Sequence, residues 1–217
     1  MITPSNRKRY FARILVLMLV LILIVSVAFN LYDAYVNHPK MQATMNDMRV
    51  RAFRRWLNDM DAAAVVLEGA ETPEDFRQAE LNLTYGAEDS SRIILTGIDT
   101  SGSYEGANKN PYLLIYEASG RLQGVAMALG FLVFKNSSAF IASIRLRFAD
   151  LTSTVRDMRV DMRAFALQDY GATYTGADLV QRLQDKGKLT DFMNYCDKII
   201  EASAEIMDYA YTHLPRG

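Results

Sequence analysis

The chain has 217 residues, half of them hydrophobic, with 24 basic and 25 acidic side chains and a formal net charge of −1. Four of the basic residues lie within the first thirteen positions, which leaves 20 basic against 25 acidic side chains in the remainder, a net charge of −5. This balance argues against nucleic-acid binding, which requires a clustered basic surface. The only cysteine, Cys196, cannot form a disulfide within the chain; we expect it to be buried rather than paired between chains.

An apolar run occupies positions 14–29 and follows a basic segment of Arg7, Lys8, Arg9 and Arg13. With its apolar flanks, the run reaches the roughly 20 residues that cross a bilayer, and aromatic residues at both ends suit the two interfaces. We therefore expect one transmembrane helix over residues 10–35. The alternative is a cleaved signal peptide, which the length of the run and the helical pattern after it disfavour.

The basic residues before the span predict its orientation. Positively charged flanks tend to stay in the cytoplasm, so residues 1–9 are expected to form a cytoplasmic tail and the rest to be exported. The character of the sequence suggests a bacterial protein. The expected location is therefore the inner membrane, with a single pass and a periplasmic C-terminal domain.

Beyond the span, helical spacing predicts an all-α domain, a helical bundle in two halves. The first half covers residues 36–96, with an apolar stripe that ends near Gly69 and a new helix that starts at Thr72-Pro73, a typical N-terminal signal. The segment Ile93–Leu95 fits either a helix or a short strand. A glycine-rich loop over 97–111 then leads into the second half, residues 112–217.

A heptad pattern in the second half predicts one long helix that buries a narrow stripe against partner helices. The rhythm extends backward through Phe134 and Met127, which suggests about ten turns. The partner helix could belong to the same chain, to a second copy or to another protein. The eight positions of this partner-helix seam are Ile141, Ile144, Phe148, Leu151, Val155, Met158, Met162 and Phe165.

Three further patterns complete the second half. Residues 125–134 are apolar but too few to cross a bilayer, so a buried helix is favoured over a second span. A short helix is expected over 178–183, and a last helix from about Thr190, its expected N-cap, to His213. The stripe of this last helix is Phe192, Cys196, Ile199, Ser203, Ile206 and Ala210. The tetrapeptide of residues 47–50, Asp-Met-Arg-Val, recurs at 157–160; we favour convergent composition over duplication, because true repeats usually show several copies.

Candidate catalytic and metal-binding residues are sparse. The two histidines, His38 and His213, lie far apart and neither has a second ligand one helical turn away. No motif for a metalloprotease, a serine hydrolase or a nucleotide-binding loop occurs. Ser90, Ser91, Ser137 and Ser138 lack an evident general base. We therefore expect no enzymatic activity, no cofactor and no metal.

Four arginines follow the span closely: Arg49, Arg51, Arg54 and Arg55. They could contact anionic lipid headgroups, at about 1 kcal/mol for each residue near a charged surface. The alternative, which we favour, is an exposed helix face on which they pair with Asp47, Asp59 and Asp61.

The sequence thus predicts a membrane-anchored scaffold or accessory subunit of a larger membrane complex, whose partners are the membrane and either other subunits or further copies of the chain. The alternative is a periplasmic small-molecule sensor or adaptor that signals through a partner, and an envelope hydrolase is a remote third hypothesis. The residues that could line a sensor site are Tyr112, Tyr116, Tyr170, Tyr174 and Tyr195.

Overall fold

The computed structural model describes residues 4–99, 101–106, 108–133, 138–167 and 178–213. Within these ranges, the side chains of residues 4–13, 132–133, 138–139, 141 and 163–167 are outside the description. The described residues form helices and loops, with no strand beyond a single isolated bridge between Ser103 and Lys109. The elements in chain order are α1 (Pro4–Gly69), α2 (Pro73–Asn82), the π-helical segment η1 (Leu83–Glu88), α3 (Asp89–Leu95), α4 (Pro111–Val133), α5 (Ser138–Leu167), α6 (Leu179–Asp185) and α7 (Leu189–Thr212).

The chain divides into two compact units, residues 1–45 and residues 46–217. The first unit holds the N-terminal part of α1, and it contains the one described stretch that is long and apolar enough to cross a membrane. Its side chains from Ile14 to Phe29 are exposed in the isolated chain, as a lipid-facing surface requires. The fold is therefore all-α and fits a single transmembrane helix followed by a helical bundle.

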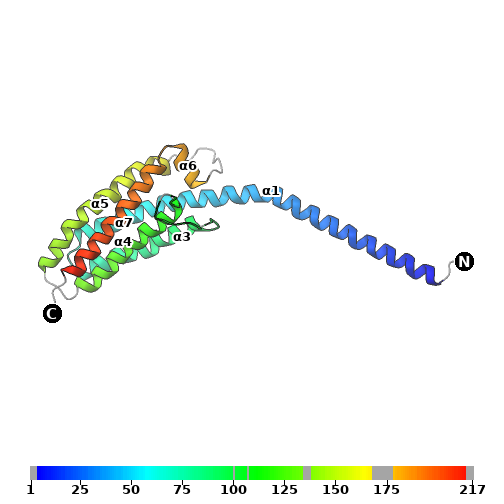
Figure 1. Cartoon of the computed structure of the whole chain (residues 1–217), viewed down its shortest axis with the longest axis horizontal. Coiled ribbons are helices and arrows are strands. Elements are labelled where there is room, and N and C mark those ends of the chain that lie inside the picture. Colours follow the sequence, from blue (N-terminus) through cyan, green and yellow to red (C-terminus); the bar gives the residue numbers. More distant parts are fainter. Residues whose placement is uncertain (1–3, 100, 107, 134–137, 168–177, 214–217) are drawn as a thin grey trace. The chain divides into compact units, whose positions relative to one another are not determined.

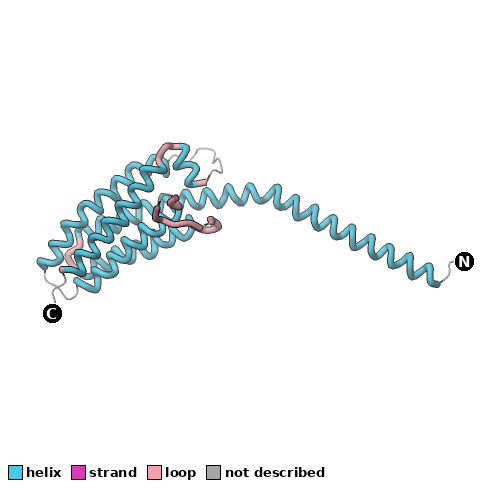
Figure 2. The backbone as a smooth tube through the Cα atoms, viewed as in Figure 1, coloured by secondary structure: helices cyan, strands magenta, loops and turns pink. Residues whose placement is uncertain are grey.

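The second unit is the bundle, in which the long helices α4, α5 and α7 lie side by side (Figures 1 and 2). Helix α7 packs against both α4 and α5, and α2 packs against α4. The C-terminal part of α1 joins them: Thr152 of α5 donates a hydrogen bond to the carbonyl oxygen of Ala64 at 3.1 Å. This buried bond ties α5 to α1.

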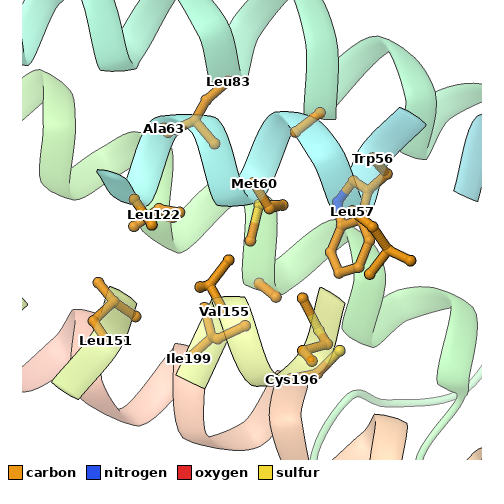
Figure 3. Packing of buried hydrophobic residues seen from close by; sticks show 14 of the residues in the cluster. Trp56, Leu57, Met60, Ala63, Leu83, Leu122, Leu151, Val155, Cys196 and Ile199 are labelled. Carbon is orange, nitrogen blue, oxygen red and sulfur yellow. The ribbon is translucent and has the colours of Figure 1, made fainter. Parts of the chain in front are cut away.

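The core of the bundle is built around the C-terminal part of α1. Trp56, Leu57 and Met60 project from α1 into a cluster that Val155 of α5 and Cys196 of α7 complete (Figure 3). The rings of Trp56 and Phe192 meet edge to face, with centroids 6.2 Å apart, an arrangement that aromatic pairs favour. Each of these side chains is buried, so the expected burial of the lone cysteine is confirmed.

The heptad seam on α5 faces the interior of this chain. All six of its members whose side chains are described are buried, and helix α7 packs along α5. Of the three partners that the sequence left open, helices of the same chain cover these positions. The buried members are Ile144, Phe148, Leu151, Val155, Met158 and Met162; the side chains of Ile141 and Phe165 lie outside the described residues.

The backward extension of the seam was wrong. Met127 belongs to α4, a different helix, where 47 % of its surface is exposed, and Phe134 lies outside the described residues. Helix α5 has 30 residues, about eight turns rather than ten. The heptad pattern looked continuous because residues 127, 134 and 141 are seven apart in the sequence. Residues 127 and 141 nevertheless belong to two different helices.

The other predicted helices agree more closely with the structure. Helix α7 buries the whole of its stripe at spacings of three and four: Phe192, Cys196, Ile199, Ser203, Ile206 and Ala210. Its start was misplaced, because Thr190 lies inside the helix and Lys188 is the N-cap residue. The segment 93–95 is helical, in α3, rather than a strand, and residues 125–133 belong to α4, a bundle helix rather than a second described span.

Helix α2 begins as the sequence predicts. The Thr72 hydroxyl accepts a hydrogen bond from the Asp75 backbone N–H, and the Asp75 carboxylate accepts one from the Thr72 N–H at 2.8 Å. This reciprocal capping box satisfies two of the free backbone donors at the helix start. With Pro73 at the first helical position, it fixes where α2 begins.

At Gly86, the π-helical segment η1 lies so close to α1 that no side chain larger than hydrogen would fit between them. A β-carbon added at Gly86 would lie 2.5 Å from the Asp59 carboxylate carbon. Only glycine fits there, since a side chain would have to displace either Asp59 or the backbone of η1. Single turns of π-helix are rare and often mark functional sites.

We expect Gly86→Ala to lower the free energy of unfolding by roughly 1–3 kcal/mol, the usual range for overpacking. Gly120→Ala is the matched control: it sits in α4 with nothing within 4 Å of the added carbon, and higher helix propensity should stabilise it by up to about 1 kcal/mol. Fluorescence of Trp56, the only tryptophan, would report unfolding of the full chain in mild detergent. Equal effects of the two substitutions would contradict the close approach.

The seam gives a second prediction. Phe148→Ala removes a fully buried ring and should lower the free energy of unfolding by about 3–5 kcal/mol. Leu146→Ala, two residues earlier on the exposed face of α5, should change it by less than about 0.5 kcal/mol. Denaturant titration followed by Trp56 fluorescence compares them, and similar losses at both positions would mean that this face of α5 is not a core face.

Candidate functional site

The four arginines that follow the span are held by contacts within the bundle. Arg49 donates from Nη1 to Asn46 Oδ1 at 2.8 Å and from Nη2 to the carbonyl oxygen of Thr96 at 2.6 Å. It thereby fastens the end of α3 to α1. Arg54 is half-buried, so neither Arg49 nor Arg54 is a freely exposed cation.

Arg51 and Arg55 are the two exposed members of this group. Arg51 forms an ion pair with Asp47 at 2.8 Å, and Arg55 lies 3.5 Å from Asp59. These are two of the pairings that the sequence favoured; the third aspartate, Asp61, instead pairs with Arg159 of α5 at 2.8 Å. Contact of Arg51 or Arg55 with lipid headgroups stays a prediction.

The two tyrosine hydroxyls of the expected sensor site whose hydrogen bonds are described donate to different carboxylates, not to one common group. Tyr112 at the start of α4 donates to Asp178, which with burial raises its pKa above the usual range. Tyr195 donates to Asp161 at 2.7 Å, and that bond is the main cause that raises its pKa to about 12. Each hydroxyl thus ties two elements of the bundle together. Of the remaining three, Tyr116 is half-exposed, and Tyr170 and Tyr174 lie outside the described residues.

The candidate nucleophiles and metal ligands that the structure describes are scattered, and Ser137 and the side chain of Ser138 lie outside the described residues. No group of three metal-ligating side chains occurs among the described residues. Burial raises the pKa of the Cys196 thiol well above its usual range, which suppresses the reactive thiolate. Ser91 donates to the carbonyl oxygen of Glu88 at 2.7 Å, and His213 lies 3.0 Å from the carbonyl oxygen of Tyr209.

Asp59 is the most perturbed carboxyl group near η1. Burial beneath Gly86 raises its pKa, and the Arg55 guanidinium lowers it by a smaller amount. The long separation of 3.5 Å between Arg55 Nε and Asp59 Oδ2 explains why the arginine does not compensate fully. The charged carboxylate is therefore an unfavourable element of the folded state at neutral pH.

An open groove with a volume of about 740 Å³ lies between α2 and α4 on the surface of the bundle. Phe131 on its α4 side is 76 % exposed, and Met127 one turn earlier is 47 % exposed. Helix α4 comes close to α2 at Gly130, where an added β-carbon would lie 3.7 Å from Phe76. The α2–α4 groove is lined by Pro73, Glu74, Arg77 and Glu80 of α2 and by Met127, Gly130 and Phe131 of α4.

Local helix geometry builds both walls of this groove. On α2, Pro73, Arg77 and Glu80 follow one another at spacings of four and three, so they share a face; the capping box at Thr72 sets where that face begins. On α4, Met127 and Phe131 are one turn apart, on the opposite side from the buried Val125, Ala126 and Leu129.

Sequence reasoning missed the groove. It interpreted the apolar segment around residue 130 as a buried helix, whereas residues 125–131 of α4 are apolar on both their buried and their exposed side. The all-round apolar character of this segment could have indicated a binding surface, because a helix that is apolar all round is expected to be covered on all sides. Here one side of α4 stays uncovered by the described residues.

With the fold and groove in view, the chain was compared with protein-family models, with curated protein sequences and with solved structures, and none of the three comparisons gave a match.

Asp59 and Asp75 should respond to pH in opposite directions. The pKa of Asp59 is raised, so its ionisation destabilises the folded state as pH rises from the unfolded value of about 3.9 through the folded pKa. The pKa of Asp75 is lowered by backbone hydrogen bonds from Glu71 and Thr72, so its stabilising effect is complete above about pH 4 and fades as pH falls through the folded pKa.

We therefore expect Asp59→Asn to gain stability relative to the native chain as pH rises from 4 to 7. Asp75→Asn should lose stability relative to the native chain as pH rises towards about 4, and show little further change from 4 to 7. Urea titrations at several pH values, followed by Trp56 fluorescence, measure both differences. A fall for Asp59→Asn would show that its pair with Arg55 outweighs burial.

Proposed function

We propose that this protein is a non-enzymatic, membrane-anchored scaffold or accessory subunit of a larger membrane complex. In this proposal the span is retained, residues 1–9 lie in the cytoplasm, and the bundle faces the periplasm of a bacterial cell. The basic flank before the span supports this orientation. The bundle then presents its surface to partners from a fixed attachment at the inner membrane.

The observation that carries the proposal is an exposed apolar groove on a bundle whose core is already complete. The seam on α5 is buried against helices of the same chain, so folding has no need of an external helix. Phe131 and Met127 nevertheless remain exposed in a groove. Full burial of a side chain of this kind is worth about 1.5–3 kcal/mol, and exposed apolar surface with a polar rim is typical of interaction sites.

The sensor hypothesis has less support. Tyr112 and Tyr195 each donate to a carboxylate of a neighbouring element, which explains them as ties within the bundle. Small-molecule sites usually enclose most of their ligand, whereas the α2–α4 groove is open and its main aromatic ring is largely exposed. A segment of a partner protein would fit it better than a metabolite.

Chemical cross-linking in intact cells, followed by purification of the full chain in mild detergent, tests the proposal. We expect the chain to be recovered in a complex with other membrane proteins. A variant whose residues 10–35 are replaced by an unrelated membrane span is the matched control, and it should keep these partners if the bundle makes the contacts. A strictly monomeric chain under all conditions would contradict the scaffold function.

A further inference from the structure

The α2–α4 groove combines an apolar side with a charged one. Phe131 and Met127 supply exposed apolar surface from α4, while Glu74, Arg77 and Glu80 line the opposite side from α2. An occupant must therefore cover an aromatic ring and at the same time satisfy charged groups. This combination restricts the chemistry of the partner.

The charged wall carries one negative charge in excess. Arg77 lies one helical turn from each of the two glutamates, and a single guanidinium can neutralise only one of them. Among the described residues, neither glutamate forms an ion pair. Elsewhere on the bundle, half-buried acids pair with an arginine four residues away in their own helix, as in Arg51–Asp47, Arg92–Glu88 and Arg121–Glu117.

This charge pattern distinguishes between possible occupants. A symmetric dimer through the groove would bring two copies of the same net-negative patch together across a two-fold axis, and their net charges would repel. An anionic lipid surface would be repelled for the same reason. A protein segment with a basic residue would instead balance the surplus carboxylate.

We propose that the α2–α4 groove binds an amphipathic helix of another protein. Apolar residues of that helix, spaced three or four apart, cover Phe131 and Met127, and a lysine or arginine within one turn of them pairs with Glu74 or Glu80. This is the helix-in-groove mode of recognition. The inference rests on the proposed scaffold function and specifies its contact site.

Site-specific photo-cross-linking of the full chain in its native membrane tests the site. Benzoyl-phenylalanine at position 131 replaces one exposed aromatic ring by another. The matched control carries the same probe at Leu146, which is 79 % exposed and lies on α5. We expect an adduct at position 131 and none at 146, with the attached peptide, identified by mass spectrometry, containing apolar residues at helical spacing beside a lysine or arginine.

Four outcomes would overturn the inference: no adduct at 131, equal adducts at 131 and 146, attachment to a second copy of this chain or to phospholipid, or a captured segment without a basic residue. The scaffold function is judged separately. If other proteins co-purify with the chain but none attaches at 131, the scaffold function stands and the groove is not the contact site.

A synthetic peptide of the captured segment then tests the charge pairing. Its affinity for the purified full chain should fall about two- to fivefold in the double variant E74Q/E80Q, the range for exposed ion pairs. R77Q, which removes the competing cation, should leave the affinity equal or higher. Phe131→Ala should weaken binding more than fivefold, and Leu146→Ala should not change it. A loss with R77Q equal to that with E74Q/E80Q would refute the assigned charge preference.

Discussion

Burial of the aromatic and aliphatic stripe on the C-terminal part of α1 is the interaction on which the bundle depends. Trp56 contacts Phe192 of α7, the backbone at Ala64 accepts a hydrogen bond from α5, and Asp59 meets η1 at Gly86. One helical segment thus contacts α5, α7 and η1. This segment belongs to the same helix that contains the apolar run.

Much of this architecture was predictable because helical periodicity is a local signal. The stripe of α7 was predicted residue by residue, since polar positions separate its buried members at regular spacing. Helix boundaries were harder. The break between α4 and α5 was missed because the heptad phase continues across it, and only the exposure of Met127 shows that the stripe had already ended. The spacing of apolar residues alone does not show where one helix ends and the next begins.

The repeated Asp-Met-Arg-Val tetrapeptide shows how tertiary context overrides local identity. In the first copy Val50 is buried and Met48 is half-exposed, whereas in the second Met158 is buried and Val160 is exposed. Equivalent positions thus face opposite ways, which favours convergent composition over duplication. The α2–α4 groove escaped prediction for a related reason: it exists only because two helices distant in sequence meet, and no local pattern records which sides of them stay uncovered.

The π-helical segment has a further consequence for where the groove lies. A π-turn holds one residue more than the α-helical pattern, and each residue of an α-helix advances the azimuth by about 100°. Segment η1 therefore offsets the angular phase of α2 from that of α3 within one nearly continuous rod. The face of α3 is fixed by the bond from Arg49 to Thr96, so the extra residue determines which way Arg77 and Glu80 point. Insertions or deletions of single residues in η1 would rotate the groove wall about the rod axis, while substitutions that preserve its length, at positions other than Gly86, would leave the wall in place.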